Sequence, residues 1–184
     1  GASVVITPSS EMAGGMGTPP LQRLIDHGIR PGLGVGTELF GAPTDLFAQM
    51  RAAISVQHAT YFDLKLAGKA GLPKLLTTRQ VIRWATVDGA RAVGLDVGTL
   101  EPGMPGDVIV LRADVPNIHP VNDPIGAVVW GMDTSNVAWV LVGGEIVKRD
   151  GVLVADVEGA RRGALDAHRR VAAAAGLVSA GGTR

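Results

Sequence analysis

The chain has 184 residues, which is enough for one large domain but too few for two catalytic domains. It carries 17 Lys and Arg residues against 17 Asp and Glu residues, so no net charge favours binding to a nucleic acid or an acidic membrane surface. Charged residues make up only 18% of the chain. The absence of Cys excludes disulfides, a thiolate nucleophile and Cys-ligated zinc, and is typical of a cytoplasmic protein.

Hydropathy gives no sign of a membrane protein. No run approaches the roughly 20 apolar residues that cross a bilayer, and the start Gly1-Ala2-Ser3 lacks the basic region of a signal peptide. We therefore expect a soluble cytoplasmic protein whose partners include a small-molecule substrate but neither a nucleic acid nor a membrane.

The first half of the chain alternates strand and helix signals. Residues 3–8 are β-branched and end at a proline, which predicts a buried parallel strand followed by a Gly- and Met-containing linker over residues 12–17. A helix is expected from Pro19-Pro20 to Gly28, then a second strand over residues 29–35. Thr44 is the expected N-cap of the next helix, so the pattern predicts two βα units.

The helix over residues 46–54 is expected to bury Leu46, Phe47, Met50, Ala53 and Ile54 on one stripe. Further along, Thr77 and Gln80 form the capping box of another helix, and a short helix is expected over residues 89–95.

From about residue 97 the apolar period changes to two, which indicates strands. The expected strands cover residues 107–111, 125–130, 137–142, 145–148 and 152–154. Gly143-Gly144 and Asp150-Gly151 are hairpin signals, so the last three strands should form an antiparallel meander. The tail from residue 158 is rich in Ala and Arg and predicts a helix.

Two patterns that suggest chemistry are weak. Residues 32–36 read Gly-Leu-Gly-Val-Gly but lack the third glycine of a dinucleotide-binding loop, so we interpret them as the end of a crowded strand. The four histidines, His27, His58, His119 and His168, show no H-x-H or H-E-x-x-H spacing and are expected to be structural.

Strand ends supply the better candidates. Glu38 follows the second strand, at the end where α/β barrels place metal ligands and general bases, although an ordinary loop carboxylate fits the position equally. Met12 follows the first strand and is a candidate wall of a pocket. Asp123 lies in an Asn-Asp-Pro turn that we expect to start a strand and to cap backbone amides.

Several segments share one ordered pattern. Residues 85–95 fit the pattern AT-x-x-GA-x-A-x-GL, and residues 98–111 resemble G-x-L-x-PGK-x-AD-x-V-x-L, with Met104, Gly106 and Ile109 at its K, A and V. Weaker resemblances cover residues 7–12, 45–51, 122–129 and 140–151. In this pattern the chain resembles the metal-dependent amidohydrolase superfamily, in particular its cytosine-deaminase-like and chlorotriazine-hydrolase-like branch. The matches at residues 122–129 and 140–151 are similar to strands of that family's small β domain.

The resemblance implies an α/β fold: the C-terminal part of a (β/α)8 barrel, containing its last two βα units, plus a small antiparallel β domain. The implied boundaries are 1–96 for the barrel units and following helices, 97–157 for the β domain and 158–184 for a helical tail. The family's histidine ligands would lie on strands that this chain does not contain. An N-terminal chain or fragment should complete the barrel, and a higher oligomer is expected.

The resemblance also implies site residues. The family carries a divalent metal, Zn or Fe, and an Asp at the end of the eighth strand. One alignment places Gly36 at that Asp, and another places Glu38 there, where it would serve as catalytic carboxylate and metal ligand. Glu11 and Met12, in the loop after the seventh strand, are the expected substrate-binding residues.

The function implied is hydrolysis of a C–N bond, other than a peptide bond, in a small heterocyclic or amide substrate. The alternative is a non-catalytic structural or regulatory subunit that keeps the amidohydrolase fold. A third possibility is a fragment of an ordinary enzyme of the same family.

Overall fold

The computed structural model describes residues 2–36 and 44–177. Its helices are α1 (Pro8–Ala13), α2 (Leu21–Asp26), α3 (Leu46–Leu66), α4 (Thr78–Ala85), α5 (Val87–Ala92), α6 (Pro124–Trp130), the 3-10 turn η2 (Thr134–Asn136) and α7 (Val157–Ala174). Its strands are β1 (Val5–Ile6), β2 (Gly32–Leu33), β3 (Val108–Leu111), β4 (Val137–Val142), β5 (Glu145–Arg149) and β6 (Val152–Leu153).

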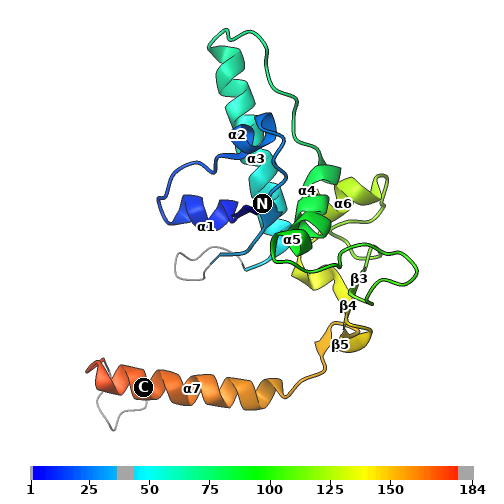
Figure 1. Cartoon of the computed structure of the whole chain (residues 1–184). Coiled ribbons are helices and arrows are strands. Elements are labelled where there is room, and N and C mark those ends of the chain that lie inside the picture. Colours follow the sequence, from blue (N-terminus) through cyan, green and yellow to red (C-terminus); the bar gives the residue numbers. More distant parts are fainter. Residues whose placement is uncertain (1, 37–43, 178–184) are drawn as a thin grey trace.

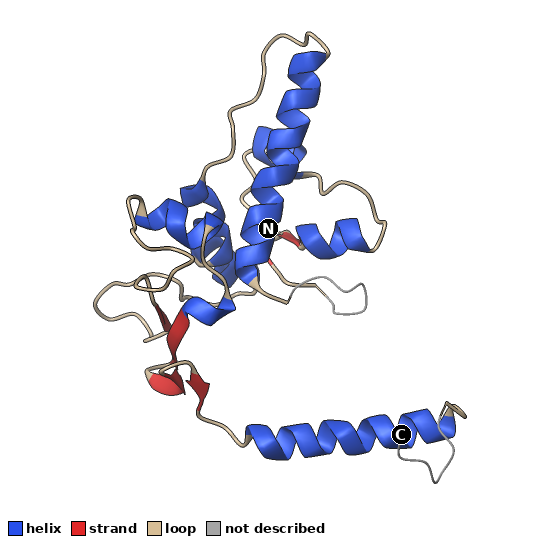
Figure 2. Ribbon diagram, turned by 180° about the vertical axis from the view of Figure 1, so that it is seen from behind, coloured by secondary structure: helices blue, strands red, loops and turns tan. Residues whose placement is uncertain are grey.

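Helix α3 is the axis of the molecule. It contacts α1, α2, α4, α6 and β2, and Figure 1 shows these elements gathered around it. Of the predicted stripe, Phe47, Met50, Ala53 and Ile54 are buried, and Leu46 is partly buried against them. The small sheet lies beyond one end of this helical body, and α7 runs clear of it (Figure 2). No helix in residues 2–36 and 44–177 combines the length and apolarity that a bilayer crossing requires.

Strands β1 and β2 form a parallel pair, with Val5 opposite Gly32 and Ile6 opposite Leu33. The order β1, α1, α2, β2, α3 confirms the predicted alternation of strand and helix. Both strands are only two residues long, shorter than the predicted 3–8 and 29–35, because each pairs along a single edge within the described chain.

Helix α1 occupies part of a segment that the sequence pattern left as strand end and linker. Pro8 starts the helix, and the Glu11 carboxylate accepts a hydrogen bond of 2.7 Å from the Thr7 backbone N–H. Proline suits a first helical position because a backbone N–H there would have no partner within the helix, so its absence costs nothing. The linker prediction was therefore wrong for residues 12 and 13.

The N-cap of α3 is Asp45 rather than the predicted Thr44. The Asp45 carboxylate accepts a hydrogen bond of 2.7 Å from the Ala48 backbone N–H. Helix α4 begins as predicted, with both hydrogen bonds of the Thr77 and Gln80 capping box present. Helix α5 lies two to three residues earlier than the expected 89–95.

The strand expected over residues 125–130 is wrong, because this segment is helix α6. Asp123 caps the helix by accepting a hydrogen bond from the Ile125 N–H, and Pro124 holds its first turn. Arg51 of α3 donates to the carbonyls of Val129 and Met132 at the other end. A cap, an N-terminal proline and a cationic C-terminal partner outweigh the β-branched composition of this segment. Asp123 does cap amides, as expected, but those of a helix.

The second half of the chain forms the sheet β3-β4-β5-β6, all antiparallel. Gly143 and Gly144 turn the β4–β5 hairpin with φ angles of 57° and 86°, which glycine adopts without strain. The predicted meander is confirmed for β4, β5 and β6. The adjacent β3 residues Ile109 and Val110 point to opposite faces and are 54% and 48% exposed, so both faces of this edge strand are open.

A stability prediction follows from the α4 capping box. Thr77→Ala removes the side-chain acceptor for the Gln80 N–H and should lower the free energy of unfolding by about 1 kcal/mol. Urea unfolding followed by circular dichroism measures this change. Thr78→Ala, one residue into the same helix, is the matched control, and an equal loss in both variants would contradict the capping role.

The packing of α3 gives a second prediction. Ile54 is 1% exposed, so Ile54→Ala should lower the free energy of unfolding by about 2–5 kcal/mol. Leu66→Ala, at the exposed end of the same helix, should change it by less than about 0.5 kcal/mol. A comparable loss in both variants would show that α3 does not organise the core.

Candidate functional site

The carboxyl ends of β1 and β2 meet at one edge of the parallel pair. Ser10, in α1 directly after β1, is 1% exposed and its hydroxyl donates a hydrogen bond of 2.8 Å to the Val35 carbonyl just after β2. This bond ties the two strand ends together. In open and closed α/β sheets, ligands bind at this end of parallel strands, so it is the candidate site.

Glu11 lies at this edge, in the first turn of α1. One of its carboxylate oxygens accepts from the Thr7 backbone N–H at 2.7 Å and from the Thr7 hydroxyl at 3.3 Å. The carboxylate therefore orders the start of α1. Met12, the next residue, is 42% exposed. The substrate-binding roles of Glu11 and Met12 stay predictions.

Gly36 has no room for a side chain. Its φ angle is 73°, and a Cβ atom built there would meet the Ser10 hydroxyl and lie 2.6 Å from the Ser10 Cβ. An aspartate at position 36 would therefore need both a strained backbone and a displaced Ser10. The space beside the second strand end is filled by Ser10.

Glu38 lies outside the described residues. Within residues 2–36 and 44–177, no three His, Asp or Glu side chains gather as a metal-binding group. The described residues therefore do not fit a metal centre by themselves.

Gln49 is a positioning residue that the sequence analysis missed. It is fully buried on α3, and its side-chain carbonyl accepts a hydrogen bond of 3.0 Å from the Ser9 backbone N–H of α1. The signal was present in the sequence, because Gln49 lies four residues before Ala53 of the predicted buried stripe, on the same side of the helix. A polar residue buried at such a position needs a partner, and here the partner is the first turn of α1 at the candidate site.

An apolar cavity of about 500 Å³ lies between the start of α3 and the small sheet. Its walls include Val35 after β2, Phe47 and Met50 on α3, and Ile109 and Val140 on β3 and β4. The Asp45 carboxylate at its rim is already used as the cap of α3. The cavity offers apolar packing rather than a set of catalytic groups.

The glycines of residues 32–36 serve close packing. A Cβ on Gly32 would lie 2.9 Å from the Gly89 Cα of α5, and one on Gly34 would lie 3.1 Å from Val5 Cγ1. The interpretation as a crowded strand end is therefore confirmed.

Two of the histidines contact backbone carbonyls, as structural histidines do. His27 Nδ1 lies 2.7 Å from the Arg23 carbonyl, and His58 Nε2 lies 3.2 Å from the Leu76 carbonyl.

The shifted pKa values belong to structural groups. The hydrogen bond from Arg112 lowers the pKa of the exposed Asp114 carboxyl, and hydrogen bonds from Ser135 lower the pKa of Asp133. Asp133 caps the η2 turn, and Asp114 pairs with Arg112 just after β3. Both carboxyls belong to turns beside the antiparallel sheet.

The chain is similar to known proteins in sequence and in fold. The Amidohydrolase family profile matches residues 1–147. A 5'-deoxyadenosine deaminase of Methanothermobacter thermautotrophicus is 31% identical over 146 residues, covering 79% of this chain and 32% of the relative. A 5-methylthioadenosine/S-adenosylhomocysteine deaminase of Pyrococcus abyssi is 27% identical over 154 residues, covering 84% of this chain and 34% of the relative.

Solved structures show the same fold at lower identity. A zinc-bound adenosine deaminase from Xanthomonas campestris superposes with a TM-score of 0.78 at 21% identity, over 92% of this chain and 37% of that one. Zinc-bound atrazine chlorohydrolase from Arthrobacter aurescens superposes with a TM-score of 0.73 at 23% identity, over 85% of this chain and 33% of that one.

The chain thus spans about a third of the length of the curated relatives it matches. The match to the Pyrococcus abyssi relative covers 84% of this chain. The family profile covers residues 1–147, from the parallel strand pair into the antiparallel sheet. With this profile match, this fold and these relatives, the chain belongs to the amidohydrolase family.

Proposed function

We propose that this chain is the C-terminal part of a hydrolase that removes an amino group from a small heterocyclic substrate of the adenosine type. The observation that carries the proposal is the similarity of most of the chain to deaminases of adenosine derivatives. The reaction replaces a C–N bond by a C–O bond, with water as nucleophile and ammonia as leaving group.

Glu38 is the residue we assign to proton transfer. Its carboxylate would accept a proton from the attacking water and return it to the departing amine, which balances the reaction. The packing of Ser10 against Gly36 supports this choice, since Gly36 has no space for the alternative carboxylate. Glu38 follows Gly36 by two residues in the sequence.

We propose that the completed enzyme binds a divalent metal, Zn or Fe, because solved structures of similar fold contain zinc. Because the described residues form no metal-binding group, we assign no reaction step to the metal in this chain. Its ligands would come chiefly from the remaining strands of the barrel, with Glu38 as the contribution of this chain.

The remaining strands would come from further polypeptide, either a separate N-terminal chain or the same one. Two features support this. The parallel pair β1–β2 has an unpaired edge on each side within the described chain, and Val5 of β1 is 48% exposed. The apolar cavity and the open faces of β3 add further uncovered surface. Open edges and apolar faces favour association with another polypeptide.

A second candidate function is a non-catalytic subunit that keeps the fold. The observation that favours it is Gly36, which leaves the end of the second strand without an acidic group. The two functions differ in what Glu38 does in the completed protein.

Substitution of Glu38 tests the assignment. In the assembled enzyme, Glu38→Gln should lower the rate of ammonia release from adenosine-type substrates by about 10²–10⁴-fold, because the amide cannot accept the proton. Glu101→Gln, an exposed residue between α5 and β3, is the control and should keep the rate. Full activity of Glu38→Gln would overturn the role, and an assembled protein that releases no ammonia would favour the non-catalytic subunit.

The need for further polypeptide has its own test. Expressed alone, the 184-residue chain should self-associate and bind a hydrophobic dye, because its strand edges and apolar faces are open. Co-expression with the N-terminal part of the barrel should give one defined complex with reduced dye binding, as measured by native mass spectrometry and fluorescence. A lone, monodisperse chain that binds no more dye than the complex would contradict the proposal.

A further inference from the structure

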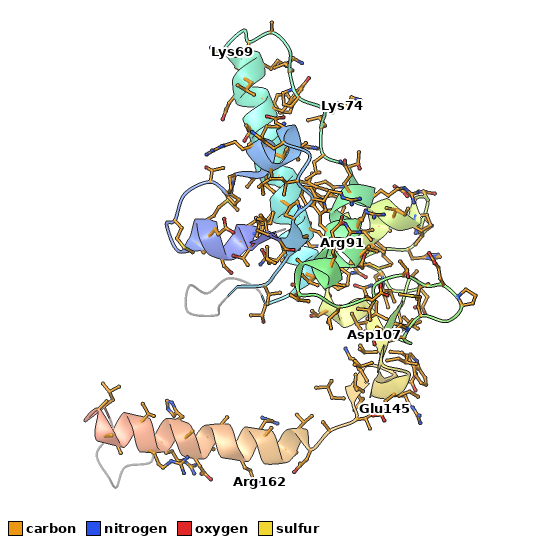
Figure 3. The ribbon with its side chains drawn as sticks, viewed as in Figure 1. Lys69, Lys74, Arg91, Asp107, Glu145 and Arg162 are labelled. Atoms are coloured by element: carbon orange, nitrogen blue, oxygen red, sulfur yellow. The ribbon has the colours of Figure 1, made fainter. Side chains whose placement is uncertain are left out.

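A cluster of charged residues lies at the opposite end of the parallel pair from the candidate site. Arg30, Arg83 and Arg91 surround the buried carboxylate of Asp88, from the chain before β2, from α4 and from α5. Figure 3 labels Arg91 on α5, near α4. We call Asp88 and these three residues the arginine cluster. Because Arg30 precedes β2 and Gly36 follows it, the two places are separate.

The three guanidinium groups make few hydrogen bonds to Asp88. The nitrogen to oxygen distances to Asp88 are 3.7 Å from Arg30, 3.4 Å from Arg83 and 3.3 Å from Arg91, and none is a close bidentate pair. Among the described residues only Arg91 forms a hydrogen bond with Asp88, and the second Asp88 oxygen has no hydrogen-bond partner. Each guanidinium carries five donors, so most of the donors in the cluster point elsewhere.

The charge of the cluster is unbalanced. Asp88 is 1% exposed, whereas the three arginine side chains are about half exposed. Three guanidinium groups and one carboxylate leave two positive charges beside a buried anion. The buried Asp88 carboxylate lies within 3.7 Å of a nitrogen of each guanidinium group, while the three arginine side chains keep about half of their surface exposed.

A cleft of about 290 Å³ adjoins the cluster. Arg30 and Arg91 line it together with Asp88, and small or aliphatic residues complete it: Ala2, Ser3, Val4, Gly28, Ile29 and Ala92. Two half-exposed guanidinium groups therefore flank a concave, partly apolar space.

From this geometry we propose that Arg30 and Arg91, held by Asp88, form a binding site for a phosphate group. A phosphate monoester carries about −1.5 to −2 charges at neutral pH, which matches the two excess positive charges of the cluster. Its tetrahedral oxygens accept hydrogen bonds from guanidinium groups that approach from different elements, whereas a planar carboxylate is matched by one bidentate arginine. The aliphatic walls of the cleft suit the organic part of a small monoester.

Inorganic phosphate is the probe for this site. Titration into the purified protein at constant ionic strength, followed by ³¹P NMR, should show saturable binding. Arg30→Gln with Arg91→Gln should weaken it by about tenfold for each guanidinium removed, since a charge-assisted hydrogen bond is worth at least one factor of ten. Arg161→Gln with Arg169→Gln, which removes two arginines from α7, is the matched control and should bind as the unchanged protein does.

Circular dichroism confirms that the variants fold. If the double variant does not fold, Arg30→Gln alone gives the answer, because Arg30 makes no hydrogen bond to Asp88 in the described structure. Equal phosphate binding by the cluster variant and the α7 control would overturn the site, as would the absence of saturable phosphate binding by the unchanged protein. This outcome is independent of the proposed hydrolase activity.

Two further ligands identify the source of the phosphate. Ethyl phosphate that binds more tightly than inorganic phosphate assigns the site to a monoester, and equal binding assigns it to free phosphate; both results support the site. Acetate at the same ionic strength should bind more weakly. Acetate binding equal to or tighter than phosphate binding would overturn the assignment to a phosphate group.

Discussion

Burial of α3 is the constraint on which the rest of the structure depends. Ala53 and Ile54 are almost completely buried, with Met50 about one turn and Phe47 about two turns earlier, so one helix supplies much of the core. Its buried glutamines form hydrogen bonds to the backbone of neighbouring segments. Gln57 holds the loop before α4 through the Leu76 N–H and the Lys74 carbonyl, and Gln49 holds α1. A buried amide left without these partners would cost stability, so the ties also define where the neighbouring segments lie.

The candidate site follows from this arrangement. Gln49 accepts a hydrogen bond from the start of α1. This helix carries Ser10, whose hydroxyl donates to the Val35 carbonyl and whose side chain occupies the space beside Gly36. The polar groups at the described strand ends are thus engaged in structure. This is why the proposed proton-transferring carboxylate is Glu38, two residues after Gly36 in the sequence, and why the proposed metal ligands belong to other strands of the barrel.

Local signals and tertiary context compete most clearly in α6. Its residues have the composition of a strand, yet Asp123 and Pro124 start a helix, and Arg51, seventy-eight residues earlier than Val129, binds the carbonyls at its end. The cap and the proline were visible in the sequence, but the contact with Arg51 was not. Thr44 and Asp45 are both suitable cap residues, and the helix begins after Asp45, whose carboxylate accepts the Ala48 N–H.

The sequence by itself determined the elements whose signals are local: the α3 stripe, the Thr77 capping box, the Gly143-Gly144 hairpin and the ordered motifs that indicated the family. Each depends on residues within a few positions of one another, so spacing alone specifies it. Only the tertiary structure decided that Ser10 fills the space beside Gly36, that Gln49 ties α1 to α3, and that three arginines converge on Asp88. These arrangements join segments far apart in the chain, and steric exclusion and charge act between them only after packing has brought them together.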